Sequence, residues 1–247
     1  MKKLIAVLLA LCVMLSLAAC GKVVAPTEAP TEAPTEAPTE APTTEAPTTE
    51  APTEAPTEAP TEAEEPSPAV GVIDGNSYSN TVLGISCDLD EEWSVLSDEE
   101  IAEAFGYMME NFEDGKLKDA IEQVGSMVVF YAARSEGLEN MNITVAGSSL
   151  YKYLAGNEDA LIEAMLPALE AQLPSAGITT ETVEAGTVMF AGEEHPCVNV
   201  VGTMNDVKVY EKQVYVISGD YLFVVTAFSA LIDSTADIMS VYNPLAE

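Results

Sequence analysis

Basic residues are scarce in this 247-residue chain, where nine Lys and Arg stand against 41 Asp and Glu, for a formal net charge of −32 at pH 7. Eleven of the acids lie between Glu28 and Glu65, which leaves 30 acids and six bases for the sequence that follows. Binding to nucleic acid depends on neutralising phosphates, so this balance argues against a nucleic-acid partner. It also predicts repulsion from anionic lipids and anionic wall polymers.

Histidine and cysteine are also few. The single His, His195, precedes Pro196 in a predicted exposed hairpin loop, and no Ser or Cys motif frames a catalytic triad with it. The four Cys include no Cys-x-x-Cys pair, so the sequence carries no metal motif of that type. We therefore expect no catalytic residues and no cofactor, and the sequence does not predict an enzyme.

Two of the cysteines, Cys87 and Cys197, lie in strand-like segments. An exported protein permits a disulfide between them. Small buried residues on apolar strands explain them equally well. The sequence leaves both alternatives open.

The N-terminus has the form of an export signal. Two lysines precede an apolar run that ends at residue 19 in small residues. The run is shorter than the roughly 20 residues that a transmembrane helix needs. A basic start, an apolar middle and a small-residue end are typical of a secretory signal.

The end of this run, Leu17-Ala18-Ala19-Cys20, resembles the lipobox of bacterial lipoproteins, in which cleavage precedes a Cys that is then acylated. The resemblance implies a signal peptide over residues 1–19 and a mature chain that begins at lipidated Cys20. Stable anchoring needs two or more acyl chains, and a diacylated Cys meets that condition. The implied location is the outer face of the cytoplasmic membrane, with the membrane as a partner.

Residues 26–63 repeat Pro-Thr-Glu-Ala. A proline at every fourth or fifth position forbids a continuous helix. Residues 20–68 are thus expected to form a semi-stiff spacer, which at about 3.1 Å per residue could reach on the order of 150 Å. That length would lift a single acidic domain, residues 69–247, into the cell wall or the exterior.

The domain has the pattern of an α+β fold with a largely antiparallel sheet. Ser97 opens a Ser-x-x-Glu capping box for a helix that Gly115 ends, and Asn157 caps a later helix that Pro167 should kink or divide. The other helices are expected at 117–124 and 234–241. Asn142 and Thr144 alternate with apolar residues, which predicts a strand with one wet face. The expected strands cover residues 82–89, 127–134, 141–145, 178–184, 187–191, 197–204, 207–217 and 221–229.

The order of these apolar positions resembles that of PsbP-like domains. Tyr78-Ser79-Asn80 is followed by Leu83-Gly84-Ile85, an acidic turn, Trp93 and a Ser-capped acidic helix, and the chain closes with two long strands and a helix. Glu91-Glu92 departs from the Pro and Gly that relatives usually have in this turn. The resemblance implies an α/β/α sandwich shared with the Ran-binding Mog family and with several bacterial lipoproteins. Its known members mostly act as non-catalytic binding or assembly factors.

Candidate site residues are few. The carboxylates around one turn are weak candidates for a cation site, although the Asp-x-Asp-x-Asp-Gly frame of a calcium loop is missing and a solvated acidic turn is the alternative. These residues are Asp88, Asp90, Glu91 and Glu92. Trp93 is predicted to plug the space under the first helix, with ligand stacking as the alternative. Met108, Met109 and Met165 are predicted to be core residues.

Three functions remain open. The first is a membrane-anchored surface lipoprotein whose domain binds a protein or a small ligand without catalysis. The second is an envelope or cell-wall hydrolase, for which the acidic turn at residues 88–92 would supply paired carboxylates. The third is a purely structural or antigenic surface protein, in which the spacer and the charge are themselves the function.

Overall fold

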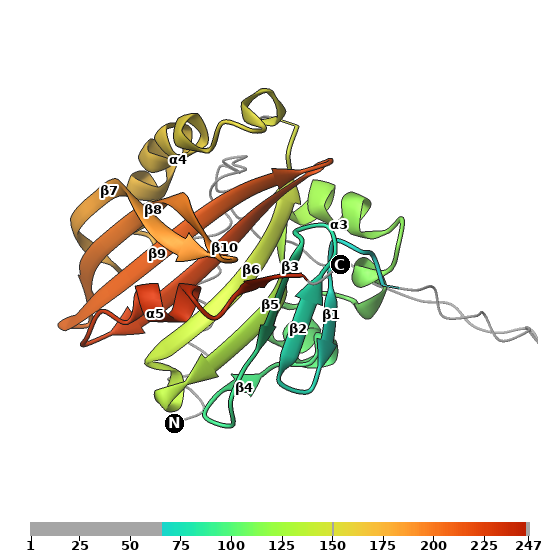
Figure 1. Cartoon of the computed structure of the whole chain (residues 1–247), viewed down its shortest axis with the longest axis horizontal. Coiled ribbons are helices and arrows are strands. Elements are labelled where there is room, and N and C mark those ends of the chain that lie inside the picture. Colours follow the sequence, from blue (N-terminus) through green and yellow to red (C-terminus); the bar gives the residue numbers. More distant parts are fainter. Residues whose placement is uncertain (1–65, 150, 246–247) are drawn as a thin grey trace, which may run out of the picture. The chain divides into compact units, whose positions relative to one another are not determined.

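Two antiparallel sheets form the centre of the part of the chain that the computed structural model describes, residues 66–149 and 151–245 (Figure 1). The larger sheet has seven strands in the order β4-β5-β6-β10-β9-β8-β7, and the smaller has four in the order β1-β2-β3-β11. Every strand pair is antiparallel. The predicted α+β fold with a largely antiparallel sheet is therefore confirmed.

The strands of the large sheet are β4 (Ser94–Val95), β5 (Ser126–Arg134), β6 (Glu139–Gly147), β7 (Thr179–Phe190), β8 (Glu193–Met204), β9 (Val207–Ser218) and β10 (Tyr221–Ala230). Those of the small sheet are β1 (Val72–Asp74), β2 (Ser77–Asn80), β3 (Ile85–Asp88) and β11 (Asn243–Pro244). The helices are α2 (Asp98–Phe105), α3 (Leu117–Val124), α4 (Glu158–Gln172) and α5 (Thr235–Met239), with short 3-10 turns η2 (Met109–Phe112), η3 (Ser135–Gly137) and η4 (Lys152–Leu154).

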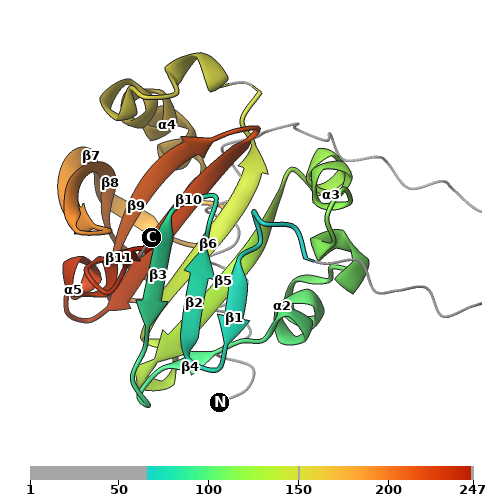
Figure 2. The same cartoon turned by 45° about the vertical axis from the view of Figure 1, so that its right-hand side comes forward.

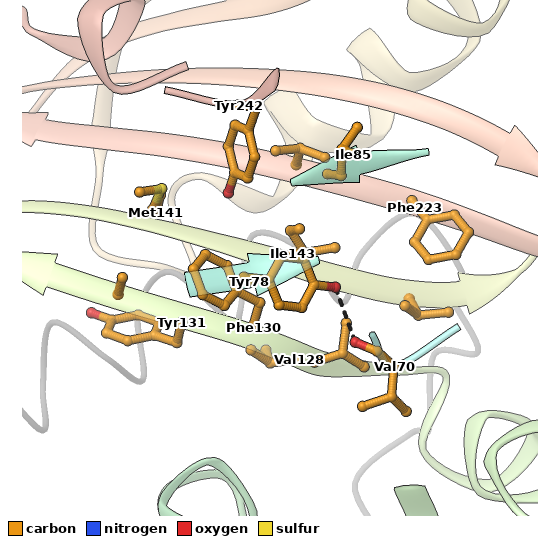
Figure 3. Packing of buried hydrophobic residues seen from close by; sticks show 14 of the residues in the cluster. Val70, Tyr78, Ile85, Val128, Phe130, Tyr131, Met141, Ile143, Phe223 and Tyr242 are labelled. Carbon is orange, nitrogen blue, oxygen red and sulfur yellow. Dashed lines mark hydrogen bonds between the residues drawn. The ribbon is translucent and has the colours of Figure 1, made fainter. Parts of the chain in front are cut away.

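The small sheet packs on one face of the large sheet, in front of β5 and β6 (Figures 1 and 2). The ring of Tyr78 on β2 stacks on Phe130 of β5 with centroids 4.4 Å apart. The Tyr78 hydroxyl donates a hydrogen bond to the carbonyl oxygen of Val70, 2.9 Å away (Figure 3). Burial raises the pKa of this phenol well above its ordinary value. The apolar layer between the two sheets belongs to the first core cluster, which also takes in buried residues of α2, α3 and α5.

The opposite face of the large sheet carries a second core cluster. Side chains alternate along β10, so that Phe223 and Val225 point into the first cluster while Leu222 and Val224 point into the second. Helix α4 packs against β7, β8 and β9. It contributes an apolar stripe to the second cluster, consisting of Leu161, Ile162, Met165 and Leu169.

Helix α2 is shorter than the predicted helix. The Ser97 capping box is present, but the chain leaves the helix at Gly106, which adopts φ +72°. The loop that follows leaves Met108 and Met109 exposed, so the prediction that both are core residues is wrong. Phe112 and Met165, by contrast, are buried.

Three further details correct the sequence prediction. The two strands expected at 178–184 and 187–191 are one strand, β7, because Ala185 and Gly186 stay in register with β8. His195 lies within β8 rather than in a loop. Helix α4 runs through Pro167 without ending there, and its Asn157 cap accepts a hydrogen bond from the Ala160 amide as predicted.

The predicted signal peptide, the lipobox, Cys20 and nearly all of the spacer lie outside the described residues. Of the helices in the described part, none is long and apolar enough to cross a membrane.

Candidate functional site

A group of polar side chains crosses the face of the large sheet that carries the second core cluster. We call it the polar row. All of its members are buried, and they come from the three adjacent strands β6, β10 and β9. The members are Asn140, Asn142 and Thr144 on β6, Thr226 on β10, and Glu211, Gln213 and Tyr215 on β9.

Strand register brings these residues together. Asn142 pairs directly with Thr226, and Thr226 pairs directly with Gln213. Glu211 and Tyr215 lie two residues to either side of Gln213, on the same face of β9. Directly paired side chains in antiparallel strands have Cβ atoms about 4.5–5.5 Å apart, and diagonal neighbours lie about 7–8 Å apart. The row is therefore one continuous patch.

The β9 members form a hydrogen-bond relay. The Tyr215 hydroxyl donates to Gln213 Oε1, and Gln213 Nε2 donates to Glu211 Oε1. The second carboxyl oxygen of Glu211, Oε2, finds no partner among the described residues. The relay therefore fixes the orientation of the Glu211 carboxyl and leaves one of its oxygens available.

Two other buried atoms of the row also lack a hydrogen-bond partner among the described residues. Asn142 Nδ2 and Thr226 Oγ1 have no hydrogen-bond partner in the described part of the chain, although both residues are 0 % exposed. Asn142 Oδ1, by contrast, accepts a bond from Thr144 Oγ1 at 3.4 Å. Native proteins pair the large majority of their buried polar atoms with protein groups or ordered water, so three unpaired atoms on neighbouring strands leave the row short of hydrogen-bond partners.

Burial raises the pKa of Glu211 from its ordinary 4.5 to about 8, and the hydrogen bond from Gln213 offsets only part of this effect. Because a charged carboxylate loses water in this setting without gaining a cation, the neutral acid is favoured. With this pKa the neutral acid predominates at pH 7, and its O–H is a potential hydrogen-bond donor.

The predicted acidic turn does not form a comparable site. The Asp88 carboxylate accepts a bond from Ser77 Oγ at 2.6 Å, and the Asp90 carboxylate accepts one from the Glu92 amide at 3.0 Å. Asp88, Asp90, Glu91 and Glu92 are all exposed. In the described ranges, no group of three or more His, Cys, Asp or Glu side chains is arranged to hold a metal ion.

The other candidates have structural roles. Trp93 is buried in the first core cluster, as predicted, and the Arg134 guanidinium lies 4.7 Å from the centre of its ring. His195 Nδ1 lies 3.0 Å from Glu158 Oε2, which joins β8 to α4, and its ring meets Phe190 edge-on.

Cys87 and Cys197 are free thiols, so the disulfide alternative does not describe the structure. Both are buried in the first core cluster, where they act as small apolar residues. Burial raises the pKa of the Cys87 thiol to about 12 and also raises that of Cys197. Both groups are therefore protonated at neutral pH.

Sequence reasoning missed the polar row. Asn142 and Thr144 were expected on a wet strand face, yet both are buried. The sequence held one indication of buried polar residues, namely Glu211 and Gln213 at alternate positions inside a long apolar strand. Alternation alone does not reveal which strands are neighbours, so it could not bring these residues next to Asn142 and Thr226.

Comparison with known proteins assigns no family. No protein-family model and no curated protein matches the sequence. Among solved structures, the crystal structure of LpqN, involved in cell envelope biogenesis of Mycobacterium tuberculosis, matches over 67 % of this chain and 77 % of that chain. The two are 11 % identical, with a TM-score of 0.30. These values are too low to assign a fold family or a function, so the resemblance to PsbP-like domains stays a prediction.

Proposed function

We propose that this chain is a lipid-anchored surface protein whose folded domain binds a hydrogen-bonding ligand on the polar row, without catalysis. The anchor rests on the sequence alone, namely on Leu17-Ala18-Ala19-Cys20 and the signal-like run before it. The Pro-Thr-Glu-Ala spacer would carry the domain away from the membrane. The partner reached there is a small ligand or an exposed part of a protein.

One observation carries the binding site. Asn142 Nδ2, Thr226 Oγ1 and Glu211 Oε2 are buried on adjacent central strands and have no partner among the described residues. Each unpaired buried polar atom costs about 1–3 kcal/mol of stability. A ligand that pairs all three would recover this free energy on binding.

The row supports binding better than hydrolysis. Glycoside hydrolysis uses two carboxyl groups that flank the scissile bond. Of the described residues, Glu211 is the only carboxyl in the row, and the acids of the turn at 88–92 lie on the separate small sheet or just beyond it. A raised pKa also suits a general acid, but here it serves to keep a donor neutral.

A thermal-shift screen of the purified protein tests the proposal. The compounds are neutral sugars, amino acids, polyamines, short peptides and divalent cations, measured on the wild-type protein and on Asn142→Leu. A ligand at 100 times its Kd stabilises by about 2.7 kcal/mol. For a domain of this size, that corresponds to a Tm increase of roughly 5–10 °C.

The expected result is a shift in the wild type that Asn142→Leu abolishes. This variant should fold, because it replaces by an apolar group a buried amide whose Nδ2 has no partner among the described residues, at the loss of the 3.4 Å bond that Oδ1 accepts from Thr144. Asn199→Leu is the matched control, since Asn199 lies on β8 with its side chain on the opposite face, where it accepts a bond from Lys212. If no compound stabilises the wild type more than Asn142→Leu, the polar row is not a binding site for these ligand classes and the proposal fails.

A further inference from the structure

We propose that the outer edge of β7 is a docking site for a protein partner, which adds an extended basic segment to the large sheet as a further strand. The site is separate from the polar row, which lies on β6, β10 and β9. Three features of the molecule favour such a partner. They are the unpaired backbone of β7, the acids beside it and a cleft at the start of the strand.

Strand β7 is the last strand of the large sheet, and among the described residues it pairs with β8 alone (Figures 1 and 2). The opposite edge of the same sheet is protected. There, β4 pairs with the end of β5, and the Leu96 amide donates to the carbonyl oxygen of Tyr131 at 3.0 Å. The Val128 amide donates to the Tyr107 hydroxyl at 3.3 Å. The two long edges therefore differ, and β7 forms the open one.

The sequence of β7 lacks the usual protection of an exposed edge. Natural sheets guard their edges with short strands, Lys, Pro or bulges. Strand β7 is 12 residues long and contains neither Lys nor Pro. Its register with β8 shifts once, between Thr180 and Thr182, and is regular from there to Phe190. Most of the strand is therefore free to accept a neighbour.

The turn after β7 shows which backbone groups face outward. It has two residues, Ala191 at φ +50° and Gly192 at φ +82°, and positive values at both positions are typical of a type I′ hairpin. Phe190 and Glu193, which flank this turn, are then a hydrogen-bonded pair, and the antiparallel ladder directs N–H and C=O of every second residue away from β8. We call these the outward residues, namely Val183, Ala185, Thr187 and Met189. Their backbone groups receive no hydrogen bond from outside the ladder in the described part of the chain.

The side chains along this edge differ between its two faces. The side chains of the outward residues lie on the face of the second core cluster, where Met189 is 51 % exposed. Thr182 and Glu184 lie on the opposite face, and both are exposed. A strand paired with β7 would place its side chains beside these two groups in alternation. A segment in which Val or Thr alternates with Lys or Arg matches both faces.

The charges around the edge favour a basic segment. Glu184 on β7 and Glu194 on β8 form no ion pair with a described residue. Lys208 reaches the start of β7, but it is paired with Glu181 at 2.9 Å. The sequence after Glu65 also carries 30 acids against six bases. This field attracts a cationic partner and repels an anionic one.

A cleft of about 470 Å³ lies where the start of β7 meets the end of α4. The last turn of α4 contains no basic residue, so the negative end of the helix dipole and the Glu170 carboxylate both favour a positive charge there. Thr180 Oγ1 has no hydrogen-bond partner among the described residues. The cleft therefore suits a Lys or Arg side chain at one end of the docked segment. Its lining consists of Glu170, Pro174, Gly177, Ile178, Thr179 and Thr180.

Two other occupants fit this edge less well. The Pro-Thr-Glu-Ala repeat of residues 26–63 brings a carboxylate in each repeat, and its prolines cannot donate to a ladder. A second copy of the chain would pair β7 with β7 and bring Glu184 of both copies to one edge, between two acidic domains. A basic segment of another protein meets neither obstacle.

Three matched peptides test the docking site. The first has about ten residues, in which Lys alternates with Val and Thr. The second carries Glu in place of Lys, and the third keeps Lys but has Pro in place of two Val. Their affinities for the purified full chain are measured by calorimetry. We expect the Lys peptide to bind and the Glu peptide not to bind, while the Pro peptide, which keeps the charge but loses ladder donors, binds about tenfold more weakly.

Ala185→Pro tests the edge on the protein itself. Ala185 is exposed and its amide faces outward, so Pro removes a donor for the partner and leaves the ladder with β8 intact. Affinity for the Lys peptide should fall about tenfold, whereas the matched variant Ala185→Thr keeps the amide and should bind like the wild type. Thermal melts check that both fold. If Ala185→Pro does not fold, Glu184→Lys should weaken binding through charge, with Glu122→Lys at an exposed position of α3 as its control.

Amide hydrogen exchange gives a readout that attraction by net charge alone does not change. The bound Lys peptide should slow exchange at the amides of the outward residues about tenfold or more. The proposal is overturned if the Lys peptide does not bind, if the Lys and Pro peptides bind equally, or if binding leaves these amides unprotected. It is also overturned if the chain sediments as a dimer that Ala185→Pro converts to a monomer, because a second copy then occupies β7.

Discussion

Glu211 shows how one buried side chain links strand register to chemistry. It is 2 % exposed, and Gln213 holds one of its carboxyl oxygens while the other has no partner among the described residues. A carboxyl in this setting is kept neutral by desolvation. Proteins that retain such a group accept a loss of stability near neutral pH, which is consistent with a binding role for the residue.

Glu211→Gln should stabilise the protein at pH 7. The folded-state pKa of about 8 lies above the ordinary 4.5, so the folded state binds more protons than the unfolded state between these values. The free energy of unfolding of the wild type therefore falls as pH rises from about 4.5 to 8 and is highest below that window. The amide takes up no proton, so the variant should gain about 3 kcal/mol at pH 7 and little at pH 4.5.

Urea denaturation at pH 4.5, 7 and 8.5, followed by the fluorescence of Trp93, measures this difference. Glu184→Gln is the control, because it makes the same substitution at an exposed position of β7. A gain of equal size at all three pH values would show that Glu211 keeps its ordinary pKa in the folded protein.

The roles of residues that depend on their neighbours in sequence could be predicted. The burial of residues that depends on the order of strands in the sheet could not. Ser97, Asn157 and the burial of Trp93 follow from capping chemistry and local pattern, and all three are confirmed. Asn142 was assigned to a wet face because it alternates with apolar residues. A central strand is covered on both faces, so alternation there separates two buried faces rather than a buried face from a wet one.

At the scale of elements, helix starts were predicted better than helix ends. The apolar spacing beyond residue 105 continues the pattern of α2, yet the chain turns at Gly106 and only Phe112 returns to the core. The residues between them form a loop and the 3-10 turn η2. Glycine at a left-handed position ended the helix, although Met108 and Met109 kept the helical spacing.

Ser97→Ala should lower the free energy of unfolding by about 1 kcal/mol, the usual effect of losing a helix N-cap. The Glu100 amide donates to Ser97 Oγ at 3.3 Å, and the Ser97 amide donates to Glu100 Oε2 at 2.9 Å. Only the first of these bonds is lost in the variant. Denaturation in urea measures the change.

Two further variants test whether the loss of stability in Ser97→Ala comes from the helix cap. Ser97→Asp restores an acceptor and should recover most of the lost stability. Ser94→Ala removes a hydroxyl from an exposed position of β4 and should change stability by less than about 0.5 kcal/mol. Equal losses in Ser97→Ala and Ser97→Asp would mean that the cap does not stabilise α2.

At the scale of the whole molecule, the sequence predicted the meander but not the packing of the two sheets. Strands β7 to β10 follow one another with short turns, so their neighbours in sequence are their neighbours in space. The small sheet depends on contacts between distant segments, such as Asn243 of β11 with Ser86 of β3. A two-residue strand at the end of the chain has no periodicity by which it could be recognised.

Cys20→Ser tests the proposed anchor, which lies outside the described residues. If Cys20 is the acylated residue, the variant should lose its acyl mass and either appear in the medium or remain unprocessed. Anchoring needs two or more acyl chains. The acidic domain is repelled by anionic lipid, so a processed variant without acyl chains should leave the membrane. Fractionation of cells and intact-mass measurement give the readouts.

Cys12→Ser is the matched control for the anchor, since it changes the other N-terminal cysteine within the apolar run and should leave a firmly membrane-bound, acylated protein. The comparison also bears on the binding site. If the Cys20→Ser protein is released with the polar row intact, it should keep the Kd of the anchored form for any ligand of the row, because Cys20 is 120 or more residues away in sequence from every member of the row. A variant that stays membrane-bound and is processed normally would show that another segment holds the chain, and the lipoprotein assignment would then be wrong.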